Sequence, residues 1–367
     1  MTVRPAGLEP EPPGRPHEYP SFELPSFPRF RPALYRPGIE TLEARCRAWL
    51  AHSLRDAHAD CPEEFEQFLA QRTTLWNLLV YATTDIERVT TICHWIDVLF
   101  SIDDLFAHAP AQRLERLGLD RLHTALDGRQ APGQAPYPRV LAILSQQLRH
   151  GMPPALWDRF SHEMSGFFDA CRTERLWQDT RTAIDLTAYE ASRGKSIGEC
   201  CFPLLEYGLG TDLTRTLTHH PELGRLNTLV ARHWIGVNDI FSYRKELYSG
   251  DTMNEITLAL AGNGGNLQAA VDRITQTIRR AEDEFCALSE CLLRSTANRD
   301  PAVAGYVKAL RWMIAGNLEW SCITTRYNGS DHVWNGHTDT TVILTPHRTL
   351  YTSSRESAKD PSGLSCP

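Results

Sequence analysis

The chain has no Cys-x-x-Cys pair and no zinc-ligand spacing, although it contains ten cysteines. It also lacks a positively charged segment followed by an apolar one at its start, so a secretory signal is not expected. The even number of cysteines therefore does not predict a disulfide framework. Reduced thiols in a cytoplasmic protein are the better interpretation.

Long apolar runs and basic excess are also missing. No stretch of eighteen apolar residues is present, so no membrane-spanning helix is expected. The net charge is -7 and the isoelectric point is about 6.1, which argues against a nucleic-acid partner bound through its phosphates. Apolar residues nevertheless make up 42% of the 367 residues, enough for a sizeable core.

Alternation of apolar and polar residues with period two is not sustained anywhere, so a β-sheet is not expected. The pattern instead predicts an all-α protein, a helical bundle around an apolar cavity. Pro203 is expected to kink one of these helices. The helix candidates are 39–55, 62–82, 86–103, 138–150, 154–174, 181–208, 221–248, 266–297 and 301–327.

Composition divides the chain into three segments. Residues 1–37 hold ten of the 23 prolines and are expected to form a flexible N-terminal arm. Residues 38–328 show no repeat and no break in composition, which favours a single helical domain. Residues 329–367 return to Gly, Ser, Thr and Pro and predict a loose C-terminal tail, with one short strand-like run at 341–344.

The clearest helix, 86–103, ends in an acidic pair, Asp103-Asp104. Asp103 continues the inward-facing stripe, and an acid on the core side must be paired, protonated or metal-bound. An isolated Asp-Asp pair at a helix end more often faces solvent. The apolar residues of this stripe recur every three or four positions: Ile86, Val89, Ile92, Cys93, Ile96, Leu99 and Phe100.

Helix 221–248 repeats this design with a different set of oxygen atoms. Asn238, Ser242 and Glu246 lie at i, i+4 and i+8 and therefore form one stripe on the helix. An amide oxygen, a hydroxyl and a carboxylate at this spacing suit a small divalent cation such as Mg²⁺. The stripe extends the edge of an apolar face that carries Val230 and Trp234.

Three cationic positions accompany the two oxygen clusters. Lys245 precedes Glu246, Arg326-Tyr327 ends the last predicted helix, and Arg193 lies beside a glycine-containing break. Taken singly, each could be an ordinary solvated side chain. Together, two oxygen clusters and several cations at the mouth of an apolar cavity are typical of an enzyme that ionises diphosphate esters.

With these residues, the chain resembles the bacterial-type class I terpene synthases (terpene cyclases). The resemblance covers about Phe22 to Tyr327 of this sequence. Asp103-Asp104 stands where that family has its aspartate-rich motif, and residues 238–246 match the second metal motif, Asn-Asp-x-x-Ser-x-x-x-Glu. Arg326-Tyr327 matches the C-terminal Arg-Tyr pair of the family. Arg193 lies 45 residues before Asn238, close to the position of the diphosphate-sensing arginine.

The aspartate-rich motif departs from the family pattern. The family usually has another acid three or four positions after the second Asp, whereas Asp104 is followed by Leu-Phe-Ala-His. Metal binding on this side is therefore expected to depend on Asp103, with Asp104 paired to a basic residue. Lower metal affinity is one consequence to test.

The resemblance implies a Mg²⁺-dependent carbon–oxygen lyase of isoprenoid biosynthesis that ionises a linear prenyl diphosphate and cyclises the cation. It implies three Mg²⁺ ions, farnesyl diphosphate as the favoured substrate with geranylgeranyl diphosphate as the longer alternative, and commonly a homodimer. The residues expected at the metal site are Asp103, Asp104, Asn238, Ser242 and Glu246. Arg193, Lys245, Arg326 and Tyr327 are assigned to the diphosphate, and Phe100 and Trp320 to the cavity wall. Trp234 is a further wall candidate, whereas core packing is the expected role of Trp95.

Three alternatives remain open at this point. A chain-elongating prenyltransferase shares the fold and chemistry, but it would carry a second aspartate-rich motif in place of residues 238–246. A di-iron protein needs Glu-x-x-His pairs, and none of the 14 histidines has Glu three positions before it. A non-catalytic helical scaffold gives no reason for the oxygen donors to align with the apolar faces.

Overall fold

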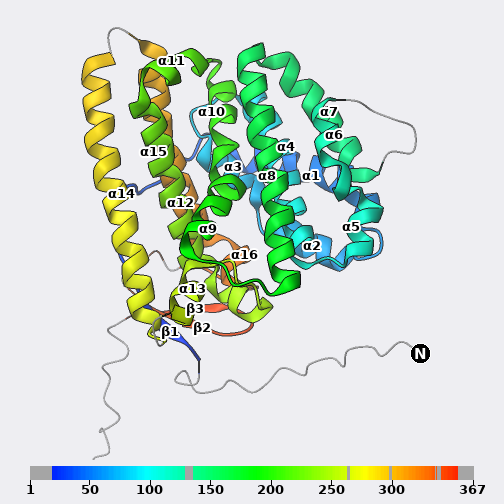
Figure 1. The fold of residues 1–367 in the computed structure, drawn as a ribbon, viewed down its shortest axis with the longest axis vertical. Helices are drawn as coiled ribbons and strands as arrows, with labels where there is room; N and C mark the ends of the chain where they lie inside the picture. Colours follow the sequence, from blue (N-terminus) through cyan, green and yellow to red (C-terminus); the bar gives the residue numbers. More distant parts are fainter. Residues whose placement is uncertain are drawn as a thin grey trace, which may run out of the picture.

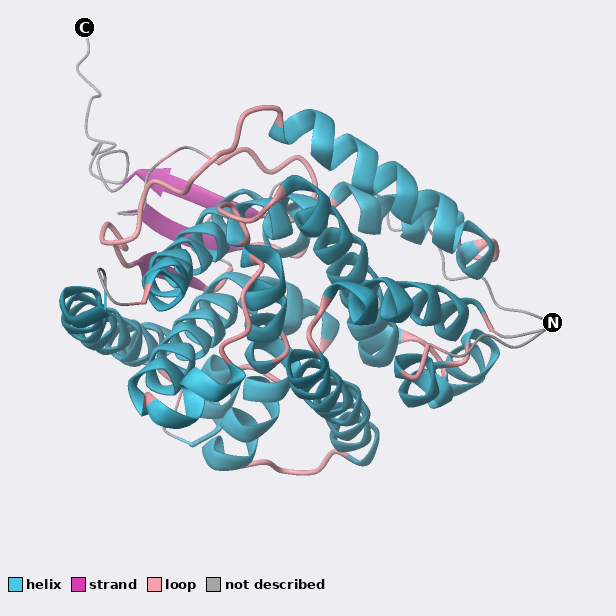
Figure 2. Ribbon diagram, turned by 90° about the horizontal axis from the view of Figure 1, so that it is seen from above, coloured by secondary structure: helices cyan, strands magenta, loops and turns pink. Residues whose placement is uncertain are grey.

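The computed structural model describes residues 19–128, 135–262, 265–296, 300–334, 336 and 340–353. It is a helical bundle, as the sequence predicts, with a small sheet at one end near α13 (Figure 1). Viewed from above, the strands lie at the edge of the bundle and outside the helices (Figure 2). No helix in this part of the chain is both long and apolar enough to cross a lipid bilayer.

The predicted helices are present, some of them divided into shorter ones. Candidate 62–82 becomes α2 and α3, and candidate 301–327 becomes α15 and α16. The longer helices are α1 (Ile39–Leu54), α4 (Ile86–His108), α7 (Pro136–Gly151), α8 (Pro154–Thr180), α12 (Pro221–Ser249), α14 (Leu267–Thr296) and α15 (Pro301–Ile323). The shorter ones are α2 (Pro62–Ala70), α3 (Thr73–Val80), α5 (Ala111–Leu117), α6 (Leu122–Leu126), α9 (Leu186–Arg193), α10 (Cys201–Leu209), α11 (Thr214–His219), α13 (Glu255–Gly262) and α16 (Thr325–Asn328).

Helix α4 forms where periodicity predicts it and extends one turn beyond Asp104. The side chain of Asp85 caps its first turn by accepting hydrogen bonds from the amides of Glu87 and Arg88. Its predicted inward stripe is buried from Val89 to Leu99 and half-buried at Phe100, whereas Ile86 is 56% exposed because it lies in the first turn at the surface. The apolar face of α4 therefore packs in the core and leads along the helix to Asp103.

The helix predicted over 181–208 is broken, but not at Pro203. The break is a π-helical segment, Gly194–Glu199, between α9 and α10. Pro203 lies in the first turn of α10, where its missing amide hydrogen is tolerated, so the expected kink does not occur there. Gly198 lets this segment approach α12, since a Cβ at this position would lie 2.8 Å from the Cβ of Ala231.

Helices α3 and α15 approach each other unusually closely at Gly316. A Cβ at this position would lie 2.4–2.6 Å from backbone atoms of Leu79 and Val80, which no side chain could tolerate. The contact brings Trp76 of α3 against Asn317 of α15, whose Oδ1 accepts a hydrogen bond from the indole nitrogen at 2.9 Å. Two helices far apart in sequence thereby form one wall.

The expectation that no sheet forms is wrong. Strand β2 (Thr340–Leu344) pairs antiparallel with both β1 (Ser21–Leu24) and β3 (Thr349–Ser353). The two segments predicted as arm and tail thus join each other. Strands this short, drawn from opposite ends of the chain, leave no sustained alternation in the sequence.

The described part of the predicted arm also differs from a flexible segment. Phe22, Leu24, Phe27 and Phe30 are at most 3% exposed and belong to the main apolar core. The prolines of this segment do exclude a helix, as expected. An irregular chain can nevertheless bury its aromatic side chains. Residues 1–18 and 354–367, and their predicted flexibility, lie outside the described residues.

A buried acid in α4 gives a prediction about stability and pH. Asp97 is fully buried and accepts hydrogen bonds from Thr74 Oγ1 at 2.6 Å and Asn77 Nδ2 at 3.0 Å. Burial raises the pKa of Asp97 to about 7, whereas an Asp in an unfolded chain titrates near pH ~3.9. Because the folded protein holds this proton more tightly, the free energy of unfolding should fall between about pH 4 and 7. This group contributes up to about 1.4 kcal/mol per pH unit.

The Asp97→Asn variant is expected to lack this contribution, because the asparagine amide does not titrate. Urea unfolding of both proteins at several pH values measures the difference between them. The variant should gain stability relative to wild type as the pH rises. A constant difference across the range would contradict the assignment.

Candidate active site

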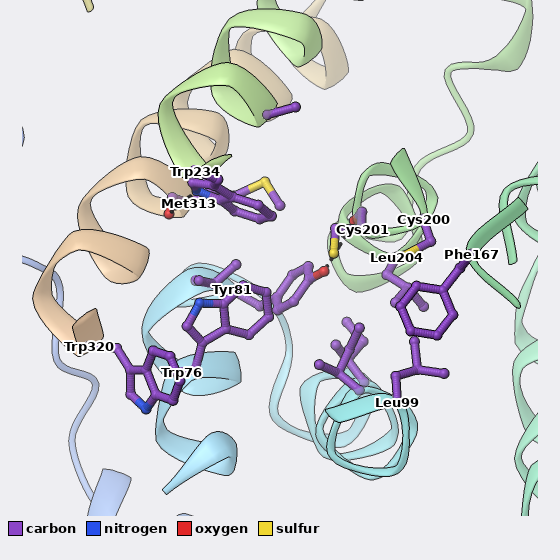
Figure 3. Close-up of a cluster of buried hydrophobic side chains, with 14 of the residues drawn as sticks. Trp76, Tyr81, Leu99, Phe167, Cys200, Cys201, Leu204, Trp234, Met313 and Trp320 are labelled. Atoms are coloured by element: carbon purple, nitrogen blue, oxygen red, sulfur yellow. Dashed lines mark hydrogen bonds between the residues drawn. The ribbon is translucent and has the colours of Figure 1, made fainter. Parts of the chain in front are cut away.

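A cavity of about 140 Å³ lies between the C-terminal halves of α4 and α12 and is enclosed by α8, the π-helical segment, α10 and α15. Figure 3 shows a cluster of buried apolar side chains from several helices, and those of its labelled residues that line the cavity are Trp76, Leu99, Phe167, Cys200, Cys201 and Trp234. The cavity brings together residues that are far apart in sequence. Eight of the predicted site residues line it: Phe100, Asp103, Arg193, Asn238, Lys245, Glu246, Arg326 and Tyr327.

The acidic pair on α4 is held by two cations from other helices. Arg326 contacts Asp104 at 2.6 Å and Asp103 at 3.3 Å, and Lys245 contacts Asp104 at 3.1 Å. Burial alone would raise the pKa of the Asp104 carboxyl, but Arg326 and Lys245 hold this pKa well below its usual range. Asp104 is therefore an ionised partner of two bases, and Asp103 is the more exposed of the two acids, with a side chain 38% exposed.

The oxygen stripe on α12 faces the acidic pair across the cavity mouth. Asn238 Oδ1 accepts a hydrogen bond from Arg193 at 2.6 Å, and its Nδ2 donates to the hydroxyl of Tyr327 at 2.6 Å. Ser242 Oγ is buried and has no hydrogen-bond partner of normal geometry among the described residues. Burial, with a smaller contribution from the charge of Asp251, raises the pKa of Glu246 to about 7.

These donors fit a hard divalent cation. Within the described residues no three His, Cys, Asp or Glu side chains form a metal-binding group, so a site here depends on the amide and hydroxyl oxygens. A buried hydroxyl without a hydrogen bond of normal geometry and a buried carboxylate that resists ionisation are both polar groups that a bound cation would satisfy. Asn238 Oδ1 retains a second lone pair beside Arg193. The stripe therefore fits Mg²⁺.

Arg193 is positioned at the junction of α9 and the π-helical segment. It is buried, and its guanidinium lies 4.0 Å from Glu174 of α8. Glu174 Oε1 also accepts hydrogen bonds from Ser192 at 2.8 Å and Ser196 at 3.0 Å. The break predicted beside Arg193 is real, and Glu174 binds one serine just before it, Ser192, and one within it, Ser196.

A second anchor joins α9 to α12. The hydroxyl of Tyr189 lies 2.6 Å from both carboxylate oxygens of Asp239, and both residues are fully buried. Asp239 belongs to the motif at 238–246 but points away from the oxygen stripe. Sequence reasoning missed Glu174 and Tyr189 because neither belongs to a motif. Tyr189 lies one helical turn before Arg193, which could have suggested it, whereas α8 carries no predicted site residue that could have pointed to Glu174.

Arg326 and Tyr327 lie on α16, a short helix that follows α15. Thr324 separates the two helices, and its hydroxyl accepts a hydrogen bond from the Arg326 amide at 3.1 Å. Arg244 of α12 donates to the carbonyl of Tyr327 at 3.0 Å. Burial raises the pKa of Tyr327 to about 12, so its hydroxyl proton is retained and can be donated to a ligand oxygen.

The aromatic wall differs from the prediction at one position. Phe100 and Trp234 line the cavity, but Trp320 does not. The Trp320 indole donates to the carbonyl of Arg72 at 2.8 Å, which holds the ring behind Phe100 and Tyr327. Trp76 lines the cavity in its place, with its ring centroid 5.6 Å from that of Phe100 and 5.4 Å from that of Trp234.

Trp95 lies outside the cavity, in the packed core expected for it. Its side chain is fully buried against Phe160, with ring centroids 5.2 Å apart, and its indole contacts Met164. Inward periodicity alone could not separate Trp95 from Trp76. The difference arises from which neighbouring helix each tryptophan meets.

Polar residues outside the motifs complete the mouth of the cavity. Gln178 of α8 donates to Asp251 at 2.9 Å, and Arg175 donates to the carbonyls of Phe106 and Ala109 at the end of α4. All of these except Ala109 line the cavity. They tie α8 to the C-terminal ends of both oxygen-bearing helices.

Comparisons with known proteins match most of this chain. A family model described as "Terpene synthase family 2, C-terminal metal binding" matches residues 94–284. "Microbial Terpene synthase-like protein 13" from Selaginella moellendorffii is 31% identical over 316 residues, 83% of this chain and 86% of that protein. "Sesquiterpene synthase Agr3" from Cyclocybe aegerita is 38% identical over 176 residues, 47% of this chain and 49% of that protein.

A solved structure with a similar fold is that of 2-methylisoborneol synthase from Streptomyces coelicolor A3(2), in complex with Mg²⁺ and 2-fluoroneryl diphosphate. Its TM-score is 0.69 at 19% sequence identity, and the match covers 84% of this chain and 99% of that one. The helical arrangement is therefore shared with that enzyme. The family-model match contains Asp103, Arg193 and the whole 238–246 segment, but it ends before Arg326.

Proposed function

Since the chain belongs to terpene synthase family 2, and is thus a carbon–oxygen lyase acting on prenyl diphosphates, we propose that it ionises farnesyl diphosphate and cyclises the resulting cation. The product would be a cyclic terpene hydrocarbon or alcohol, released together with diphosphate. Geranylgeranyl diphosphate is the longer alternative substrate. The name of the Cyclocybe aegerita relative, a sesquiterpene synthase, supports the choice of farnesyl diphosphate.

One observation carries the proposal: the oxygen donors and the cations converge at one end of a cavity whose other walls are apolar and aromatic. Asp103 on α4 and Asn238 and Glu246 on α12 line this mouth, and the buried Ser242 lies between the last two on the α12 stripe. A prenyl diphosphate has the same division, with an anionic head and a long apolar chain. The cavity can therefore hold both parts at once.

Asp103, Asn238, Ser242 and Glu246 are the residues that would hold Mg²⁺, and three ions are part of the proposal. Bound Mg²⁺ supplies positive charge that meets the growing negative charge of the leaving diphosphate. The 2-methylisoborneol synthase structure contains both Mg²⁺ and a prenyl diphosphate analogue, which supports this assignment. We also propose that the protein associates as a homodimer and that residues 38–328 form a single helical domain, against whose core Phe22, Leu24, Phe27 and Phe30 of the preceding segment pack.

Four side chains would contact the diphosphate directly. Arg193, Lys245 and Arg326 supply charged donors, and Tyr327 supplies a hydroxyl proton. Lys245 and Arg326 are already held by Asp104, which aims them towards the mouth before any substrate arrives. Pre-oriented donors lower the barrier more than mobile ones because they need no reorganisation during the reaction.

The apolar wall governs the fate of the cation once the diphosphate has left. An allylic cation is quenched by water, so the cavity must exclude water while it folds the chain. The faces of Trp76, Phe100 and Trp234 can each stabilise a nearby cation by roughly 0.5–2 kcal/mol. Ring contacts among these three side chains hold their faces in fixed directions.

Incubation of the purified protein with geranyl, farnesyl and geranylgeranyl diphosphate tests the proposal. We expect diphosphate release only in the presence of Mg²⁺, the highest kcat/KM with farnesyl diphosphate, and cyclic volatile products. Controls contain EDTA, or isopentenyl diphosphate together with an allylic diphosphate. Formation of longer prenyl diphosphates would favour the chain-elongating alternative, and Mg²⁺-independent release would contradict the metal assignment.

A further inference from the structure

The loop after α12 turns back beneath the last turn of that helix. Gly250 makes the reversal in the left-handed region, with a φ of 77°, and the amide of Asp251 bonds back to the carbonyl of Glu246 at 3.0 Å. Three residues later, Asn254 is fully buried. The loop thus places a side chain from outside the motif directly against the metal helix.

Asn254 makes three short hydrogen bonds there. Its Nδ2 donates to Glu246 Oε2 at 2.6 Å and to the backbone carbonyl of Asp239 at 2.8 Å. Its Oδ1 accepts from the amide of Ile256 at 2.7 Å, which caps the first turn of α13. Both amide hydrogens and the oxygen are therefore committed, and the side chain has one orientation.

The contact with Glu246 determines how that carboxylate can act. One oxygen, Oε2, is fixed by the Asn254 amide, which leaves Oε1 for a cation at the mouth of the cavity. A carboxylate held in one rotamer binds a metal with less loss of conformational freedom than a mobile one. Residues that orient a ligand in this way commonly change metal affinity by ~10–100-fold when they are replaced.

We propose that Asn254 is a positioning residue that presents Glu246 to Mg²⁺, so that the metal site extends into the loop after α12. The inference rests on the proposed function, because it assumes that Glu246 binds Mg²⁺. The sequence motif ends at Glu246 and gives no indication of this role. The hydrogen bond to the Asp239 carbonyl additionally ties the loop to the first turn of the oxygen stripe.

Capping of α13 is a second role of Asn254, and two substitutions separate it from positioning. Asn254→Ser retains a side chain that can cap α13 but is too short to reach Glu246 as well. Asn254→Ala removes both roles. Asn266 provides a matched control, because its Oδ1 caps Ala269 at 2.9 Å in the first turn of α14, on the exposed surface.

The readout is thermal stabilisation by Mg²⁺ in the presence of inorganic diphosphate, which needs no turnover. Asn254→Ser and Asn254→Ala are both expected to raise the Mg²⁺ concentration at half-maximal stabilisation by about 10-fold or more. Asn266→Ser should leave it within about 2-fold of wild type, as expected for a surface cap without a link to the metal. A wild-type Mg²⁺ requirement in Asn254→Ser would restrict Asn254 to capping and overturn the proposal.

If the serine variant does not fold, Asn254→Asp retains the size and the cap but replaces the donor to Glu246 with an acceptor. The same rise in Mg²⁺ requirement is expected, and an unchanged requirement would overturn the proposal. Failure of the proposed function is distinguishable from both results. In that case the wild-type protein itself would show no stabilisation by Mg²⁺ with diphosphate.

Discussion

Replacing Glu246 with glutamine is expected to slow Mg²⁺-dependent diphosphate release by about 100-fold or more, within the range seen when one electrostatic partner of a transition state is removed. Glutamine has nearly the same shape, and its amide oxygen can still accept the hydrogen bond from Asn254. The substitution therefore removes mainly the negative charge. Glu246 is the only acid among the three donors of the stripe on α12. The substitution therefore removes the only negative charge that this stripe offers to the cation.

The measurement is the initial rate of diphosphate release from farnesyl diphosphate at saturating Mg²⁺. Glu255→Gln is the matched control, because Glu255 is also buried and acidic but pairs with Arg232 and Arg273 outside the residues that line the cavity. The control should retain most of the wild-type rate. A Glu246→Gln variant as fast as wild type would remove Glu246 from the metal site.

The Arg326→Met variant is expected to lose stability as well as activity. The Arg326 side chain is 5% exposed and bonds to Asp104, Asp103 and Gln71, so its removal leaves two carboxylates without their main partner. Removing one member of a buried ion pair costs about 3–5 kcal/mol of unfolding free energy. Asp104 keeps Lys245 at 3.1 Å, so we expect the lower end of this range.

Urea unfolding measures the effect, and a second substitution tests its cause. Adding Asp104→Asn to Arg326→Met should recover part of the lost stability, because it removes one of the unpaired charges. Arg225→Met is the control: Arg225 pairs with Glu284 at 2.6 Å, but both side chains are about half exposed, so a loss of about 1 kcal/mol or less is expected. Equal losses at the two arginines would contradict the role of burial at Arg326.

Local sequence was sufficient to predict the helices that carry the site. The 3.6-residue period of α4 and α12 predicts an apolar face on each, and the same period places Asn238, Ser242 and Glu246 on one stripe. It also indicated a break beside Arg193. It also marked 341–344 as strand-like, and this run lies in β2, but it failed for β1, for β3 and for the pairing of segments from opposite ends of the chain.

Two tryptophans of the cavity region show that local sequence does not predict contacts between residues far apart in the chain. Trp320 and Trp76 are both buried on helices that were expected to form, and only one of them lines the cavity. The choice depends on the carbonyl of Arg72, which binds the Trp320 indole, and on Gly316, which brings α3 against α15. Neither partner is a helical neighbour of the tryptophan it affects.

The sequence by itself therefore determined which atoms could perform the chemistry and on which helices they lie. Only the tertiary structure decided which of them meet: Arg326 with Asp104 across 222 positions, Arg193 with Asn238 across 45, and Asn254 with Glu246 through a reversed loop. The physical reason is that helical periodicity is a property of neighbouring residues. Contacts between helices depend instead on how closely their backbones can pack, on where each helix ends, and on which buried polar group finds a partner.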